Sequence, residues 1–133
     1  MYGIRGIDAQ RTHWVSKKMA IYENLPVFKL SYDLLIDIYG MAKNMPRDYR
    51  FTIGEELKRR VMDQMICIYH ANGSKNEDKW LYLKKAREYI VEIKLFIRLL
   101  SDLKQISIKR MAVLTEKTES ISKQLTAWAK SVK

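Results

Sequence analysis

The stretch from Asn76 to Lys104 constrains the fold most, because its apolar residues recur with the period of an α-helix. At about 100° per residue, one set of its side chains falls within an arc of about 120°, the width of a core-facing helix surface. This set is Tyr82, Ala86, Tyr89, Ile90, Ile93, Phe96, Ile97 and Leu100. The sequence therefore predicts one long helix with one side in a hydrophobic core.

The other side of this predicted helix carries a second pattern. Its cations fall within an arc of about 80°, with a tryptophan at the N-terminal end. We call this set the basic stripe: Trp80, Lys84, Arg87, Lys94 and Arg98. Leu95 and Leu99, here called the leucine patch, lie just beyond it. Charged residues on helices are often only solvated, so the pattern alone leaves a solvated face and a binding face both open.

Three further segments show helical periodicity. The segment from about 25 to 44 has Pro26 in its first turn, and its inner face is Leu30, Leu34, Ile38, Met41 and Met45. Its opposite side carries an apolar line, here called the tyrosine ridge, which we expect to form a contact surface. The ridge consists of Tyr32, Ile36 and Tyr39.

Local signals delimit the remaining helices. Pro46 ends the first helix, and Thr52 with Glu55 predicts a capping box for the second. Asn72 and Gly73 predict a left-handed cap at its end, Asn76 a cap for the third helix, and Ser107 a cap for the fourth. Short connections favour an all-α, antiparallel up-down-up-down four-helix bundle over residues 25–133. Residues 1–24 lack a sustained period and are expected to form an N-terminal arm.

The charge balance points to a polyanionic partner. The chain has 133 residues, with 25 Lys and Arg against 15 Asp and Glu, and a net charge of +10. Its one cysteine, Cys67, lies among apolar neighbours, which predicts a buried thiol in a reducing compartment. Because no segment resembles a signal peptide or a membrane span, we expect a cytoplasmic protein without membrane contact.

Catalytic patterns are weak in this sequence. His13 and His70 lack partners at metal-binding spacing, and Asp33 and Asp37, one turn apart, are better explained as a solvated polar stripe than as a magnesium site. No nucleophile elbow or glycine-rich phosphate loop occurs. We therefore expect no catalytic residues, metal or cofactor, and a binding protein rather than an enzyme. Charge alone leaves RNA, DNA and an acidic protein open as partners.

Several motifs occur in an order that is similar to a known family. They are Phe28-x-x-x-Tyr32-Asp33-Leu34-Leu35-x-x-x-Tyr39, then Pro46 with Arg50-Phe51-Thr52-Ile53-Gly54, then Lys94 to Arg98, and Leu125-x-x-Trp128. Together they span about residues 25–131 and resemble the four-helix proteins related to those encoded in ribosomal-RNA intervening sequences. Within that superfamily the chain most resembles Avd, the accessory variability determinant of diversity-generating retroelements. The intervening-sequence branch has Asn-Ile-Ala-Glu-Gly where this chain has Tyr69-His70-Ala71-Asn72-Gly73.

The resemblance implies a basic homopentameric ring that binds a reverse transcriptase and nucleic acid, either template RNA or DNA, during mutagenic cDNA synthesis. It also implies a role for two basic residues one turn apart, which match Lys94 and Arg98 here. Since the first is lysine where the family often has arginine, a point charge is expected there rather than a bidentate contact. The alternative is an intervening-sequence-type protein with a structural or regulatory oligomeric role.

Overall fold

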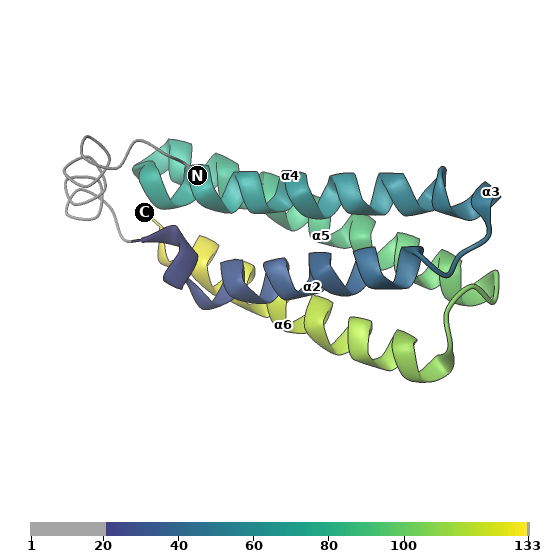
Figure 1. Cartoon of the computed structure of the whole chain (residues 1–133). Coiled ribbons are helices and arrows are strands. Elements are labelled where there is room, and N and C mark those ends of the chain that lie inside the picture. Colours follow the sequence, from purple (N-terminus) through teal and green to yellow (C-terminus); the bar gives the residue numbers. More distant parts are fainter. Residues whose placement is uncertain (1–20, 133) are drawn as a thin grey trace.

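The computed structural model describes residues 21–132, and all the regular structure in this range is helical. The elements are η1 (Tyr22–Asn24), α2 (Pro26–Ala42), α3 (Arg47–Arg50), α4 (Ile53–Gly73), α5 (Asn76–Asp102) and α6 (Ile108–Ser131). The four long helices form a bundle, which confirms the predicted all-α fold (Figure 1). The expected arm over residues 1–24 lies outside the described residues, except for its last residues, which form η1.

The long helices follow one another around the bundle. Helix α4 packs between α2 and α5, and α6 packs between α5 and α2, so neighbours in the chain are neighbours in space. One end of the bundle carries α3 and the connection between α5 and α6, and the other end carries η1 and the turn between α4 and α5 (Figure 1). No described helix has both the length and the apolar character needed to cross a membrane.

The core fixes the rotation of α5. Its fully buried residues are Leu83, Ala86, Ile90, Ile93, Ile97 and Leu100, while Tyr82, Tyr89 and Phe96 pack at the border of the core. The predicted inner face is thus confirmed, and Leu83 is a core residue that the sequence interpretation left out. Because each buried leucine or isoleucine contributes about 1.5–3 kcal/mol, turning this helix by even one residue is strongly unfavourable.

A buried polar contact links α2 to α4. The Ser31 hydroxyl donates a hydrogen bond of 2.7 Å to the Val27 carbonyl, and the Gln64 amide nitrogen donates one of 2.8 Å to the Ser31 oxygen. Both side chains are fully buried. Since sliding either helix would leave these groups unpaired in the core, the contact also selects the register between α2 and α4.

The start of α4 differs from the prediction. The capping box is wrong, because the Thr52 hydroxyl donates to the Asp48 carbonyl instead of accepting from the first amides of α4. The reason is α3, an additional turn whose exposed carbonyl groups lie within reach of Thr52. Glu55 is therefore free to pair with Lys58, with a distance of 3.0 Å between Oε2 and Nζ.

Of the other predicted helix ends, two differ from the prediction and one is confirmed. Helix α4 includes Gly73 and ends without a left-handed glycine, while the Ser74 hydroxyl donates a 2.7 Å bond to the His70 carbonyl. Asn76 is the first residue of α5 rather than its cap, with φ at 52°. The predicted cap at Ser107 is confirmed, since its oxygen accepts a 3.0 Å bond from the Arg110 amide.

The buried thiol on α4 gives a test of this packing. Cys67 is buried as predicted, and burial raises the pKa of its thiol above the ordinary value. The thiolate is the reactive form, so at pH 8 we expect the folded protein to react with a disulfide reagent at least about tenfold more slowly than the urea-unfolded chain. Stopped-flow absorbance measures both rates. Equal rates would show that α4 does not shield Cys67.

Candidate nucleic-acid interface

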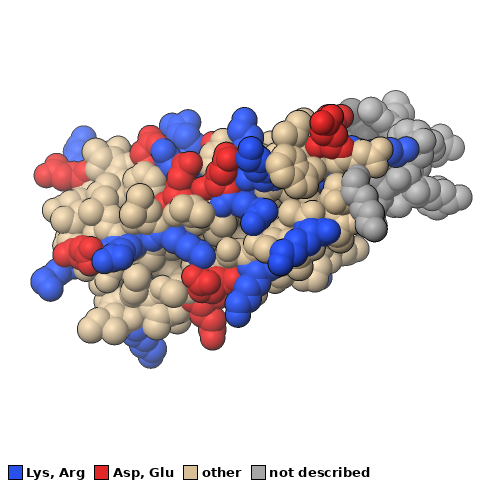
Figure 2. Space-filling view, turned by 180° about the vertical axis from the view of Figure 1, so that it is seen from behind, with Lys and Arg blue, Asp and Glu red and all other residues tan. Residues whose placement is uncertain are grey.

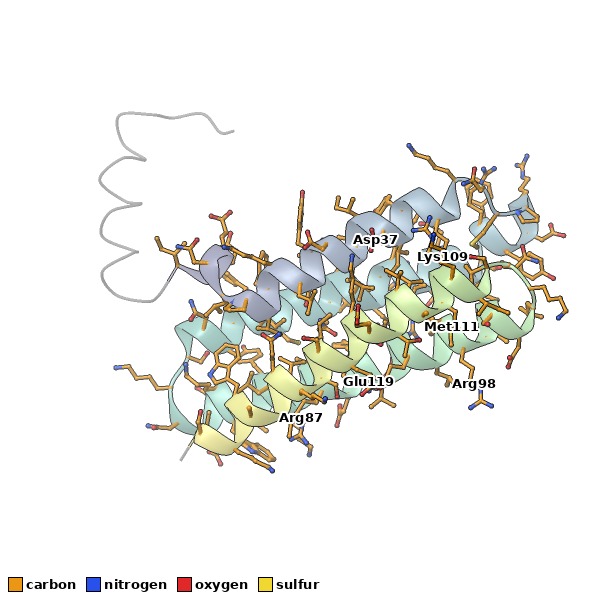
Figure 3. The ribbon with its side chains drawn as sticks, turned by 90° about the horizontal axis from the view of Figure 1, so that it is seen from below. Asp37, Arg87, Arg98, Lys109, Met111 and Glu119 are labelled. Atoms are coloured by element: carbon orange, nitrogen blue, oxygen red, sulfur yellow. The ribbon has the colours of Figure 1, made fainter. Side chains whose placement is uncertain are left out.

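The basic stripe lies on the solvent side of α5, because the opposite face of the helix is buried in the core. Lys84, Arg87 and Arg98 are exposed, whereas Lys94 is half-buried. Figure 3, seen from below, shows Arg87 and Arg98 on the same side of the bundle, with Glu119 of α6 between them along its length. The structure therefore brings the predicted cations to one side, next to α6.

Lys94 is not a free cation. Its Nζ lies 3.0 Å from Oε2 of Glu119 on α6, and only 31% of the Lys94 side chain is exposed. Thr115 and Ser122, one turn from Glu119 on α6, are uncharged, whereas Glu116 and Lys123, also one turn away, carry opposite charges. The pair with Glu119 thus makes Lys94 less available to an external anion than the sequence pattern suggested. Sequence reasoning missed this carboxylate because it comes from another helix.

The remaining cations of the stripe are more available. Arg98 Nε lies 3.9 Å from Asp102 Oδ2, and the two side chains are 76% and 69% exposed. An exposed pair of this kind contributes about 0.3–0.5 kcal/mol, so an incoming anion readily displaces it. Arg87 forms no ion pair with any residue in the described part of the chain. Arg87 and Arg98 are therefore the cations best placed to meet an external phosphate.

Trp80 is partly exposed and already contacts a cation. The Lys84 ammonium lies 5.5 Å from the centre of the Trp80 ring, on the same helix one turn away. A second pair of the same kind joins Lys79 of α5 to Trp128 of α6, also at 5.5 Å. An unpaired base stacked on Trp80 would lie beside the Lys84 charge, which combines stacking with phosphate attraction at one place.

On the flank of α5 that faces α4, a cation is paired with carboxylates. Arg60 of α4 pairs with Glu92 of α5 at 2.8 Å and with Glu56 of its own helix at 2.5 Å. The hydrogen bond from Arg60 lowers the pKa of Glu56, so this carboxylate stays charged near neutral pH. Lys and Arg side chains alternate with Asp and Glu on the side of the bundle opposite to that of Figure 1 (Figure 2). The basic stripe is thus a narrow band on the α6 side of α5.

Apolar residues that the core does not use form further surfaces. The tyrosine ridge on α2 is about half exposed at each residue, and in the leucine patch Leu95 is 66% exposed. The sequence interpretation missed a third line on α4, although its spacing of four and three residues is helical. That line is Met62, Ile66 and Tyr69. Lys58 of α4 lies 4.3 Å from the Tyr39 ring centre, which places the ridge on the side of α2 that faces α4.

Side chains of the types used in catalysis are engaged in other contacts. Asp37 pairs with Lys117 across α2 and α6, and the His70 ring stacks on Tyr82 with 5.0 Å between centres. Within residues 21–132, no group of three or more His, Cys, Asp or Glu side chains is arranged to hold a metal ion. His13 lies outside the described residues. The candidate residues that remain in the described range are the exposed cations of α5 and the exposed apolar residues.

Comparison with known proteins gives a family and a fold. Residues 25–132 match the model of a family described as bAvd-like. A crystal structure of a protein of unknown function from the S23 ribosomal protein family of Bacteroides thetaiotaomicron superposes with a TM-score of 0.72. The two chains are 18% identical, and the match covers 84% of this chain and 100% of the other, which supports the bundle fold alone. No curated protein matches this chain.

The surface position of the stripe predicts a small effect on stability. Replacing Lys94 and Arg98 together by alanine removes one partly buried and one exposed ion pair at the surface, each of which contributes at most about 1 kcal/mol. We expect the midpoint of thermal unfolding, followed by circular dichroism, to fall by less than about 7 °C. As a control, Ile93→Ala creates a core cavity and should lower the midpoint much further. A drop as large as the control would place the two cations in the structural framework.

Proposed function

The chain belongs to the bAvd-like family, and from this we propose that it is a non-enzymatic accessory protein of a diversity-generating retroelement. The family implies association with such an element, and its members generally assist rather than catalyse. In this role the protein binds the element's reverse transcriptase and nucleic acid during mutagenic reverse transcription. The observation that carries the proposal is the band of exposed cations on α5 beside α6.

The spacing of these cations suits a flexible polyanion. Along the axis of α5, Lys94 and Arg98 are about 6 Å apart and Arg87 and Lys94 about 10 Å, so each can reach a different phosphate. Trp80, at the N-terminal end of the same side, adds a surface for an unpaired base. On α6, Thr115 and Ser122 lie beside Glu119 and would not repel a strand, so Glu119 is the carboxylate of this helix that directly opposes Lys94.

Glu119 gives this interface a built-in competitor. Its carboxylate holds Lys94 in the free protein, so a phosphate must displace it before Lys94 contributes fully. Displacing the Glu119 carboxylate costs part of the binding free energy. Arg87 and Arg98 therefore make the first contacts with phosphate. The arrangement favours a partner with several phosphates over a single anion.

Assembly would multiply these contacts. We place the tyrosine ridge of one subunit, widened by Met62, Ile66 and Tyr69, against the leucine patch of the next. Because the two surfaces lie on different helices, this contact is head-to-tail, the kind that closes rings, and a homopentamer is the closed form we propose. Since the leucine patch lies on the α4 side of the basic stripe, α6 and the stripe remain open to nucleic acid.

A second role has one observation in its favour. The carboxylates of Glu119 and Asp102 each lie within 4.0 Å of a stripe cation, as expected of a merely solvated face. In that case the bundle acts as a structural or regulatory oligomer, and its positive charge serves solubility. Nucleic-acid affinity and polymerase affinity distinguish the two roles.

The salt dependence of RNA binding tests the interface. Fluorescence anisotropy with a short labelled single strand gives the affinity between about 50 and 200 mM salt. Each phosphate contact to a single strand contributes about 0.7 to the slope of log affinity against log salt. Lys94→Ala with Arg98→Ala should therefore flatten the slope by about 1.4 per contacting subunit. If RNA affinity holds but capture of the reverse transcriptase fails, the stripe binds the polymerase; if both hold, it is only solvated.

Removing the competitor should act in the opposite direction. Glu119→Gln frees Lys94 while changing the shape of the side chain little, so RNA affinity and salt slope should both rise. Glu116→Gln is the matched control, since this exposed carboxylate of α6 forms no ion pair with a described residue. An equal rise in both variants would show that net charge alone matters and that Lys94 has no particular position in the interface.

The proposed ring depends on the leucine patch. Leu99→Glu places a charge within an apolar contact, so sedimentation velocity at micromolar concentration should show smaller species while circular dichroism keeps its helical signal. Val113→Glu, on α6 and outside the proposed contact, should leave the assembly intact. A monomeric unaltered protein, or a Leu99→Glu variant that sediments like it, would contradict this interface.

A further inference from the structure

The short helix α3 forms a rigid corner at one end of the bundle (Figure 1). Met45 just before it is buried, and Tyr49 within it packs against the core. A Cβ atom added to Gly54 of α4 would lie 3.3 Å from the Tyr49 carbonyl oxygen and 3.4 Å from Met45 Cε. The backbone of the corner thus packs directly on α4. This packing fixes the positions from which the side chains of α3 extend outward.

An exposed aromatic ring and two arginines occupy the outside of this corner. Phe51 is 57% exposed. The guanidinium carbons of Arg47 and Arg50 lie 5.6 Å and 5.0 Å from the centre of its ring. A guanidinium over an aromatic face keeps its N–H donors pointing outward in its own plane. The ring therefore positions both cations without using their hydrogen-bonding capacity.

These two arginines differ from others on the surface. Arg59, Arg60 and Arg98 each lie within 4.0 Å of a carboxylate. Arg47 and Arg50 form no ion pair with any residue between 21 and 132, although Asp48 lies between them in the sequence. Nε of Arg50 is also shielded and unpaired among these residues. The outer N–H donors of the two guanidinium groups are held by no carboxylate of the described residues, which suits them to an incoming anion.

The space beside the ring is large enough for a nucleotide. An open hollow of about 490 Å³ is lined by Arg47, Asp48, Phe51 and Thr52, and small-molecule sites span about 300–1,000 Å³. Further exposed cations, Lys104, Lys109 and Arg110, belong to the same end of the bundle, where Figure 3 labels Lys109. Ile108 beside them is 88% exposed. Charge and apolar surface occur together here, as single strands require.

We propose that Arg47, Arg50 and Phe51 form a second nucleic-acid site, which binds a phosphate and the adjoining unpaired base of a single strand. The arginines contact the phosphate, and the exposed part of the Phe51 ring stacks on the base. This inference rests on the proposed nucleic-acid function but assigns a contact away from α5. An acidic peptide fits less well, because it offers carboxylates without a flat ring for Phe51.

Anisotropy with a short labelled oligouridylate tests the site. Arg47→Ala with Arg50→Ala, and separately Phe51→Leu, should each weaken binding by about tenfold at low salt. Arg47→Lys with Arg50→Lys keeps the charge but loses the planar fork, so it should weaken binding similarly. Arg59→Ala with Lys29→Ala removes the same charge elsewhere and should have a much smaller effect. Thermal melts ensure that each variant is folded.

The outcomes separate this site from the α5 interface. If the Arg47 and Arg50 alanine pair binds like the unaltered protein while the Lys94 and Arg98 pair weakens, the corner site is wrong and the proposed function stands. If instead the Arg47 and Arg50 alanine pair weakens binding while the Lys94 and Arg98 pair does not, the corner site is supported and α5 is not part of the RNA interface. No effect in either pair, or no binding by the unaltered protein, overturns both. Displacement of the RNA by polyglutamate as effectively as by unlabelled oligouridylate would overturn the corner as a nucleic-acid site.

Discussion

The packing of α5 against α4 and α6 determines where the proposed binding residues of α5 lie. Its buried line, from Leu83 through Ile90 and Ile97 to Leu100, leaves only one rotation of the helix that avoids large apolar exposure. That rotation turns the basic stripe toward solvent on the α6 side and the leucine patch toward the α4 side. A binding surface and an assembly surface therefore follow from one hydrophobic core, without any residue serving both.

Partners on neighbouring helices then decide which cations are available. Glu119 holds Lys94, Arg60 is shared between Glu56 and Glu92, and Lys117 pairs with Asp37. Arg87 stays unpaired with the described residues, and Arg98 is only loosely held. The count of 25 Lys and Arg residues thus overstates the cations that a strand can reach. Among the cations that remain free, the proposed contacts use those of the α5 stripe and the α3 corner.

The sequence predicts what depends on periodicity and leaves out what depends on contact between helices. Four amphipathic segments gave the bundle, and the inner face of α5 emerged with only Leu83 missing. Helix α3 was not predicted, because four residues are too few to show a period, and its carbonyl groups redirected the Thr52 hydroxyl from its expected cap. Lys94 and Glu119 are 25 positions apart in the chain, so no local sequence pattern predicts their ion pair.

The central claim is that nucleic acid binds along the α6 side of α5, and cross-linking locates such contact directly. Ultraviolet irradiation of the protein with single-stranded RNA, followed by mass spectrometry of the linked peptides, should place an adduct at Trp80 and further adducts in the peptides that contain Arg87 and Arg98. Adducts confined to the outer faces of α2 and α4, at the tyrosine ridge and at Tyr69, would contradict the account.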